Sequence, residues 1–150
     1  MNLQTIPNKP LTITEVLNHV RTHLLTQNAK CEMRKYPGAI PMCLYRHEGM
    51  SCAVGCLIPD EYYNSNWEEN GVEELIAPWA QQFGTGLQFK DLMNQVVDLS
   101  NPHVKKLLEA LQYIHDTCHV KDWTKELDRL NGCETWDGTA WIEFMDVLMG

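Results

Sequence analysis

The residues Cys43–Asp60, CLYRHEGMSCAVGCLIPD, bring together three of the six cysteines, an arginine and a histidine, and they decide the local fold. Met42–Arg46 is a short strand-like run, and the next three residues, His47-Glu48-Gly49, predict a hairpin turn in which glycine supplies a positive φ. The return strand is predicted over Met50–Cys52. The segment therefore predicts a small β-hairpin that carries reactive side chains.

The apolar run after this hairpin, Ala53–Ile58, is closed by Pro59. Its length fits either a short buried helix or a strand, because periodicity does not separate the two over so few residues. We favour a helix with Ser51 as its N-cap, since serine accepts hydrogen bonds from the first free backbone amides of a helix. That helix would place Cys52 at its N-terminus.

The rest of the chain has mainly helical patterns. Thr12 and Glu15 form a capping box for a helix over about residues 12–27. Asn101-Pro102 supplies a cap and a first-turn proline for a helix to about residue 118. Further helices are expected over 72–83 with a break at Pro78, around 89–96, over 122–131 with Asp122 as cap, and over 141–148. The prediction is a mainly α fold of five to six helices with one small β-hairpin, an α+β single domain over residues 1–150 that begins with an extended lead-in, residues 1–10.

The composition excludes several functional classes. The chain has 150 residues, a net charge of −8 and no basic stripe, which argues against direct nucleic-acid binding, because that needs cations clustered along a phosphate backbone. No run of about 18 apolar residues is present, so no membrane span is expected. The N-terminus lacks a basic region followed by an apolar one, and the cysteines are accordingly expected to be reduced thiols of a cytoplasmic protein.

The C-terminal part of the chain is acidic. After Arg129 there is no lysine or arginine, whereas four acids remain, Glu134, Asp137, Glu143 and Asp146. Two interpretations stay open. The acids form a solvated helix face that favours solubility, or they steer the protein onto a basic partner.

A thiol nucleophile is the first chemical hypothesis. Backbone amides and the dipole at a helix N-terminus favour the thiolate, which would activate Cys52. His115 is the candidate base. Asp116 is not expected to orient the His115 ring, because successive helical residues point about 100° apart. The alternative is that Cys52 is a small buried apolar residue, as free cysteines often are.

A metal site is the second hypothesis. Its ligands would be Cys52, Cys56, Cys118 and His119. They would complete a tetrahedral zinc site if the two segments meet, although zinc more often uses close-spaced knuckle pairs. His19 and His23 form another pair at helical spacing, for which a polar helix edge is the alternative.

A small-ligand pocket is the third hypothesis. Arg46 stands beside the glycine turn, where a guanidinium can clamp a phosphate or carboxylate through two hydrogen bonds. Tyr45 or a nearby tryptophan is expected to stack on a base. Gly55, inside an apolar run, indicates close packing or close approach of a ligand. The alternative for Arg46 is an ion pair with Asp60 or another acid.

The motif that joins these residues consists of Cys43-x-Tyr45-Arg46, then Cys52-Ala53-Val54-Gly55-x-Leu57-Ile58-Pro59-Asp60, then Leu111-Gln112-x-Ile114-His115-Asp116. It resembles a motif of a group of small uncharacterised proteins encoded by bacteriophages, prophages and some bacteria. The resemblance covers about residues 12–120 and implies no particular activity. It implies a phage accessory protein in the cytoplasm of a bacterial host, of a kind that binds and blocks a host factor, including components of antiviral defence.

The two-part motif also predicts a spatial arrangement. Residues 43–60 and 112–116 should meet, so that Arg46, Cys52, Gln112 and His115 share one cleft, with Tyr45 as a further ligand-binding residue. The leading hypothesis is a non-enzymatic protein, without a cofactor, that inhibits or sequesters a host protein or a small nucleotide-like ligand. Its working surface is either this cleft or the acidic C-terminal face. The alternatives are a Cys-dependent hydrolase and a zinc-stabilised structural module.

Overall fold

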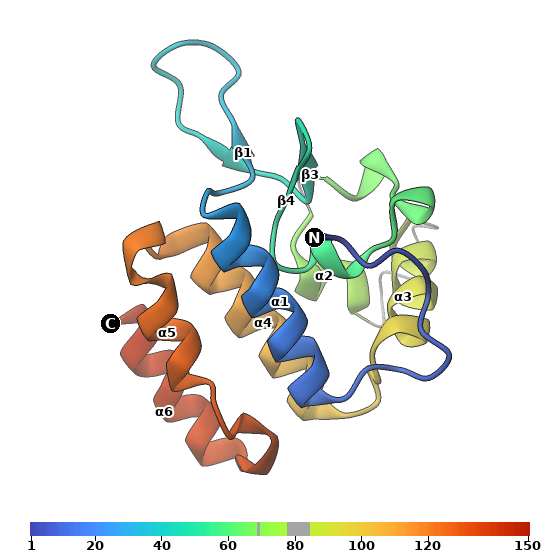
Figure 1. The fold of residues 1–150 in the computed structure, drawn as a ribbon, viewed down its shortest axis with the longest axis vertical. Helices are drawn as coiled ribbons and strands as arrows, with labels where there is room; N and C mark the ends of the chain where they lie inside the picture. Colours follow the sequence, from blue (N-terminus) through green and yellow to red (C-terminus); the bar gives the residue numbers. More distant parts are fainter. Residues whose placement is uncertain (69, 78–84) are drawn as a thin grey trace.

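Two long helices, α1 (Ile13–Gln27) and α4 (Pro102–Thr117), lie side by side at the centre of the molecule (Figure 1). The structure, a computed structural model, describes residues 1–68, 70–77 and 85–150. The N-terminal ends of the two helices line a common hollow, and a hydrogen bond joins the region just after α1 to the last turn of α4. The helices therefore run in the same direction, and their facing apolar stripes form the middle of the core.

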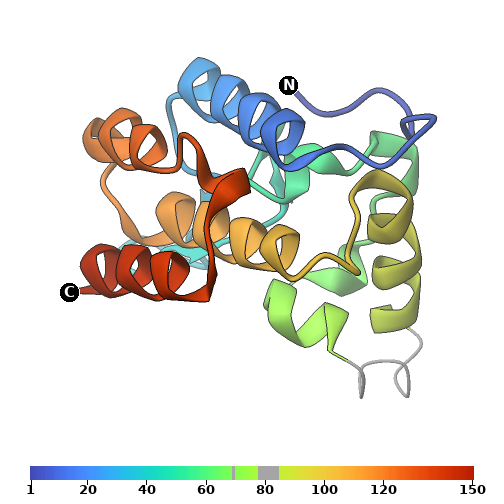
Figure 2. The same ribbon diagram turned by 90° about the horizontal axis from the view of Figure 1, so that it is seen from below.

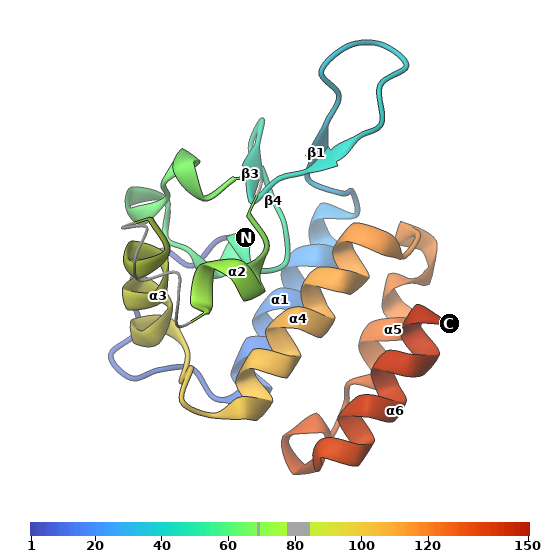
Figure 3. The same ribbon diagram turned by 180° about the vertical axis from the view of Figure 1, so that it is seen from behind.

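Shorter helices flank this central pair. On one side lie α5 (Trp123–Arg129) and α6 (Gly138–Met149), and on the other lie α2 (Val72–Ile76) and α3 (Thr85–Val96) (Figures 1 and 3). Figure 2, seen from below, shows the same division. Buried side chains from both sides and from the centre belong to one continuous hydrophobic cluster. The predicted fold class, mainly α with a small β-hairpin, is confirmed.

The helix boundaries follow the capping residues that the sequence indicates. Thr12 and Glu15 form a complete capping box at α1. At α4, the side chain of Asn101 accepts a hydrogen bond from the backbone N–H of His103 at 2.9 Å. The last helix begins earlier than the predicted residue 141: α6 starts at Gly138, and the side chain of Asp137 accepts a hydrogen bond from the backbone N–H of Ala140 at 2.9 Å. Asp122 occupies the N-cap position of α5, as predicted, but its side chain makes no capping hydrogen bond.

The predicted hairpin is present as β3 (Arg46–His47) paired antiparallel with β4 (Met50–Ser51). Its turn holds Glu48 at φ 48° and Gly49 at φ 81°, the two successive positive φ angles that a tight hairpin needs. A second ribbon pairs β1 (Glu32–Met33) with β2 (Met42–Cys43). β2 is the start of the predicted strand-like run Met42–Arg46, whereas no strand was expected at β1. Two residues a strand are too few for an alternating pattern to be recognised in the sequence.

The α-helix predicted over Ala53–Ile58 is absent, and Ser51 does not act as its N-cap. The segment forms one 3-10 turn, η1 (Gly55–Leu57), in which Leu57 donates to Val54 at 3.0 Å and Ile58 donates to Gly55 at 3.1 Å. Ser51 lies in β4 and donates its hydroxyl to the side chain of Asn2 at 2.6 Å. Pro59 ends the turn, so the run is too short for an α-helical nucleus.

Other segments complete the path of the chain. Short 3-10 turns connect the helices, η2 (Asp60–Tyr62), η3 (Ser65–Trp67), η5 (Val120–Asp122) and η6 (Cys133–Thr135). The lead-in, residues 1–10, has no regular structure and is tied to the body by a hydrogen bond from Leu3 to Cys56 at 2.9 Å. Of the helix predicted over 72–83, α2 is the first part, and Pro78 lies outside the described residues. Among the described residues, no helix combines the length and apolar character needed to span a bilayer.

Candidate functional site

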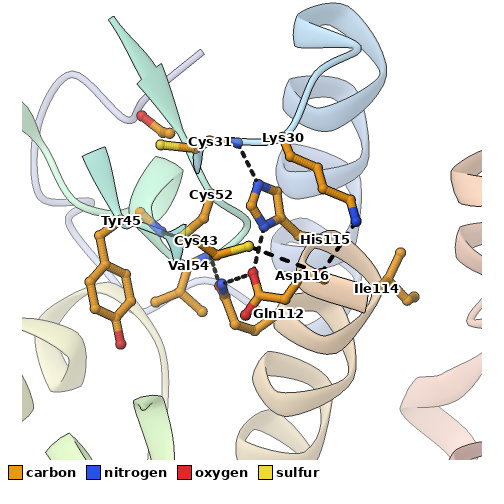
Figure 4. Close-up of polar contacts among 12 residues, drawn as sticks. Lys30, Cys31, Cys43, Tyr45, Cys52, Val54, Gln112, Ile114, His115 and Asp116 are labelled. Carbon is orange, nitrogen blue, oxygen red and sulfur yellow. Dashed lines mark hydrogen bonds and ion pairs between the residues drawn. The ribbon is translucent and has the colours of Figure 1, made fainter. Parts of the chain in front are cut away.

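The two motif segments meet, as the sequence predicts, near the C-terminal end of α4 (Figure 4). The side-chain oxygen of Gln112 accepts a hydrogen bond from the backbone N–H of Val54 at 3.1 Å, and its amide group donates to Oδ1 of Asp116 at 2.9 Å. Gln112 and Asp116 are one helical turn apart, so α4 presents both to the 43–60 segment. These bonds fix the segment against the helix.

His115 closes the same network from inside the protein. Its side chain is fully buried and stacks on Trp123, with ring centroids 5.7 Å apart. Nε2 lies 2.9 Å from the backbone nitrogen of Cys31, and Nδ1 lies 2.6 Å from Oδ1 of Asp116. A backbone N–H only donates, so Nε2 is the acceptor and Nδ1 carries the proton. We name this set the His115 junction: the amides of Cys31 and Val54 with the side chains of Gln112, His115 and Asp116.

The expectation that Asp116 does not orient the His115 ring is wrong. The offset of about 100° between neighbouring helical residues fixes the directions of the two Cβ atoms. It does not fix the ends of the side chains, and here the carboxylate turns back to Nδ1 at the last turn of α4. The result is a histidine held by a carboxylate, an arrangement that active sites also use to fix a tautomer.

This arrangement does not provide a general base. A base needs a lone pair free to take a proton from a nucleophile or a substrate. The lone pair of His115 Nε2 already accepts from the amide of Cys31, and the ring has no exposed surface. The His115 junction therefore uses the imidazole to satisfy a buried backbone donor and to tie the end of α1 to α4.

Cys52 does not have the surroundings of an activated nucleophile. Because the α-helix predicted at Ser51 is absent, no helix N-terminus favours its thiolate. Its sulfur accepts a hydrogen bond from the backbone N–H of Gly55 at 3.1 Å, but burial dominates and raises the pKa of the thiol well above its usual value. Cys52 is fully buried. The structure supports the alternative of a small buried core residue.

The predicted zinc ligands do not come together in the described part of the chain. The one group of potential ligands found there is Cys43, His115 and Asp116, whose ligand atoms lie within 4.8 Å of one another. A metal on His115 would have to use Nδ1, but the amide of Cys31 keeps the proton on Nδ1. Lys30 also donates to the backbone oxygen of Asp116 at 3.3 Å and adds a positive charge there. These groups do not fit a metal ion.

The expectation of one shared cleft is also wrong. Arg46 lines a polar hollow of about 510 Å³ next to Asp60. Gln112 and Tyr45 line a separate hollow of about 230 Å³. Cys52 and His115 are fully buried.

Both terminal nitrogens of the Arg46 guanidinium bond within the chain, although its buried Nε has no hydrogen-bond partner among the described residues. The guanidinium forms an ion pair with Asp60, as the structural alternative proposed, and donates to the backbone oxygens of Gly55, at 3.1 Å, and Ile58. The ring of Tyr63 lies beside it, with its centroid 5.5 Å from Cζ. A phosphate or carboxylate ligand would have to displace these internal acceptors. Arg46 thus fixes the hairpin onto the turn around η1.

Tyr45 belongs to a network centred on Glu68, which the sequence did not single out. The Glu68 carboxylate accepts from the backbone N–H groups of Tyr45, at 2.8 Å, and Arg46, at 3.1 Å, and from the hydroxyl of Tyr63 at 2.5 Å. The Tyr45 hydroxyl donates to the backbone of Asn70 at 2.7 Å, and burial raises its pKa above the usual value. A glutamate in an acidic loop carries no sequence sign of this role.

His19 and His23 link α1 to the segment after the hairpin. The Nε2 atom of His23 lies 2.9 Å from the backbone oxygen of Ser51, and that of His19 lies 3.2 Å from the oxygen of Cys56. Both carbonyls can only accept, so both rings carry the proton on Nε2. Burial lowers the pKa of both residues, that of His23 to about 4. They are structural donors rather than a metal pair.

The four acids of the predicted C-terminal face separate into two groups. Asp137 caps α6, and Glu134 lines a different hollow together with Asp98 and the start of α1. Glu143 and Asp146 lie three residues apart and exposed on α6 itself. The sequence therefore predicted an acidic surface, but only these two acids lie along the helix.

Apolar side chains share this surface of α6. Ile142, Val147 and Met149 are 60%, 67% and 61% exposed, although Trp141 and Phe144 on the opposite face are buried. A groove of about 390 Å³ runs beside them, lined by Arg129, Trp136, Ala140, Glu143, Phe144 and Val147. We name the α6 surface as this groove with the exposed side chains of Ile142, Glu143, Asp146, Val147 and Met149. The sequence of residues 141–149, WIEFMDVLM, indicates this exposure, because seven of its nine residues are apolar. One buried helix face cannot accommodate all of them, so some apolar side chains must face solvent.

Comparison with protein-family models, with curated proteins and with solved structures finds no match. The resemblance to phage-encoded proteins stays a prediction. The function is therefore argued from the geometry of the described residues.

Proposed function

We propose that this chain is a non-enzymatic binding protein whose α6 surface docks a basic, amphipathic segment of a host protein. The observation that carries the proposal is the exposure of three large apolar side chains among acids, beside a groove with aromatic walls. The side chains of the His115 junction, in contrast, are bonded to one another. Contiguous exposed apolar groups rimmed by charge are typical of protein-binding surfaces.

The arrangement of side chains on α6 suits a partner helix or extended segment. Ile142, Asp146 and Met149 follow one ridge of the helix, and Glu143 and Val147 follow the next. Burial of one such apolar side chain stabilises a complex by roughly 1.5–3 kcal/mol. Burial of three such side chains, together with the rings of the groove, offsets much of the free-energy cost of the translational and rotational freedom that two molecules lose on association.

The charges of α6 specify the chemistry of the partner. Glu143 and Asp146 are exposed, and the sequence from residue 130 onwards contains no lysine or arginine. Arg129 lies at the groove, but its guanidinium pairs with Glu126 and covers the ring of Phe144, with 4.6 Å between Cζ and the ring centroid. The free charge on this surface is negative, so it favours and steers a partner with lysine and arginine.

The biological setting of the proposal rests on the resemblance. Small accessory proteins of phages commonly bind and block host factors, and the proposed partner is accordingly a bacterial protein, with antiviral defence among the candidates. A small nucleotide-like ligand has less support, because the Arg46 guanidinium is taken by Asp60 and two backbone oxygens. The inhibitor of a host protein is the function that these observations favour.

The test is affinity capture from a bacterial lysate with matched surface variants. One variant, Ile142→Ser/Val147→Ser, removes exposed apolar groups, and a second, Glu143→Lys/Asp146→Lys, reverses the charge. The control, Glu61→Lys/Asp91→Lys, makes the same change of net charge at exposed acids elsewhere. We expect wild type and control to retain a partner that both α6 variants lose, and high salt to weaken its capture.

The result must then be repeated with the purified partner. A binding isotherm should show at least about a tenfold weaker affinity for each α6 variant and no change for the control. Equal capture by all four proteins would place the binding surface elsewhere and refute the proposal.

A further inference from the structure

A second exposed apolar feature stands on the other ribbon of the molecule. The connection between β1 and β2, residues 34–41, projects from the body (Figures 1 and 3), and we name it the arm. Its side chains Tyr36 and Ile40 are 66% and 87% exposed. The guanidinium of Arg34 donates to the backbone oxygen of Ala39, and the amide of Ala39 donates to Tyr36 at 3.0 Å. The arm is thus a closed loop that presents its apolar groups outward.

The arm and the α6 surface together hold most of the exposed large hydrophobic side chains among the described residues. The seven such residues are Met1, Tyr36, Ile40, Tyr62, Ile142, Val147 and Met149. Two belong to the arm and three to the α6 surface. Apolar groups that gather in this way on a water-exposed surface indicate contact sites.

The two surfaces are opposite in charge. Arg34 and Lys35 enter the arm as neighbouring exposed cations, and Glu32 is the acid at its base. The α6 surface carries Glu143 and Asp146. The arm is a basic loop with a tyrosine at its turn, and the groove is acidic with aromatic walls. The two are therefore complementary in charge and in apolar character.

From this complementarity we infer that the arm of one copy of this protein docks in the α6 groove of a second copy. Tyr36 and Ile40 enter the groove beside Trp136 and Phe144, and the two cations of the arm face Glu143 and Asp146. The contact forms between molecules, since the arm points away from α6 of its own chain (Figures 1 and 3). Arg129 also lies at the groove, but it repels the cations of the arm only weakly, because its ion pair with Glu126 offsets its charge.

The inference deepens the proposed function and rests on it, because it assigns a regulation to the same surface. An arm from a second copy covers the groove where the host segment would bind. Self-association and partner binding then exclude each other, and dilution or an excess of partner releases the surface. The docked arm resembles the partner in kind, a basic segment with large apolar groups.

The experiment is sedimentation equilibrium of the full chain, without any partner, using complementary charge reversals. The arm variant is Arg34→Glu/Lys35→Glu, and the groove variant is Glu143→Lys/Asp146→Lys. We expect the wild type to form dimers or longer assemblies that weaken with salt, and each variant alone to remain a monomer. An equimolar mixture of the two variants should regain association, because the acidic arm of the first variant can dock in the basic groove of the second.

A second arm variant keeps the result interpretable. Arg34 also bonds to Ala39, so its reversal could alter the arm, whereas Tyr36→Ser/Ile40→Ser retains Arg34 and removes only the apolar groups. It should reduce self-association at least about tenfold. A monomeric wild type, variants that associate as wild type does, or a mixture that fails to associate would each overturn the inference. None of these outcomes bears on capture of a host partner, which the earlier test decides.

Discussion

The His115 junction and the α6 surface are opposites in composition and in use. The first gathers the residue types that chemistry usually requires, a cysteine-rich segment, a histidine and a carboxylate, and bonds each polar group to another within the chain. The second is built from isoleucine, valine and methionine with two acids, and leaves them uncovered. Buried polar groups must be satisfied internally, so a dense polar motif in a sequence can be structural. Function is then sought where side chains lack internal contacts.

The largest effect that this comparison predicts concerns cysteine labelling. Burial raises the pKa of both thiols, but Cys52 is fully buried, whereas Cys118 is partly exposed. With iodoacetamide at neutral pH, Cys52 should react only when the core opens, at least about a thousandfold more slowly than Cys118. Peptide mass spectrometry over time measures both rates.

Two results would decide the comparison at this point. In urea, all six thiols should react at similar rates, which controls for intrinsic differences between the peptides. Labelling of Cys52 in the folded protein as fast as that of Cys118 would restore the hydrolase hypothesis, and the His115 junction would have to be reinterpreted.

The next largest effect is expected for Gly55→Ala. A Cβ at this position would overlap the backbone oxygen of Tyr45 and lie 3.2 Å from the sulfur of Cys52. Neither group can move without disturbing the hairpin, so we expect a loss of about 4 kcal/mol in the free energy of unfolding. Urea denaturation measures it. The matched control is Gly138→Ala at the start of α6, where nothing lies within 4 Å and the change should be close to neutral.

A smaller loss is expected for His115→Ala. The change leaves the buried amide of Cys31 without an acceptor and removes the ring stacked on Trp123. Together these effects should lower the free energy of unfolding by about 3 kcal/mol. His119→Ala is the control, because His119 is exposed and only four residues away. Similar losses in the two variants would mean that the junction does not hold the fold together.

Much of the fold was predictable because local rules determine it. The caps at Thr12 and Asn101 and the glycine of the hairpin turn are short-range signals, and the structure places helices and turn there. The turn around Gly55 was not predictable. Its form depends on contact with Tyr45, which only the folded chain brings near.

The site was predictable in its contacts but not in its chemistry. The motif correctly indicated that the 43–60 segment meets Gln112. The partner that decides the state of His115 is the backbone amide of Cys31, and a backbone amide has no sequence signal. The exposure of Ile142 and Val147 was missed for a similar reason, since an apolar helix predicts burial until its neighbours are known.

Acid should lower the free energy of unfolding through protonation of His23. Burial lowers its pKa in the folded protein to about 4, below the ordinary value of about 6.5. Above about pH 6.5, His23 is neutral in both the folded and the unfolded protein, and the free energy of unfolding has its full value. As the pH falls from about 6.5 to 4, the unfolded chain binds a proton that the folded protein does not, so the free energy of unfolding falls by about 2 kcal/mol.

The test is urea denaturation across this pH range. His23→Gln should remove most of the slope, because glutamine keeps a donor for the oxygen of Ser51 but does not titrate. The control, His119→Gln, should keep it. An unchanged slope in His23→Gln would assign the acid sensitivity to other groups.

The smallest effect is expected on α6, and it is the one that the proposed function needs. Ile142→Ser/Val147→Ser should change the free energy of unfolding by no more than about 0.5 kcal/mol, since both side chains already face water. Phe144→Ala, on the buried face of the same helix, should cost about 3 kcal/mol. Both are measured at low protein concentration, so that self-association does not contribute. A loss above about 1 kcal/mol for the serine pair would mean that these side chains are packed in solution. The α6 surface would then belong with the His115 junction as structure, and the contrast from which its binding role is argued would no longer hold.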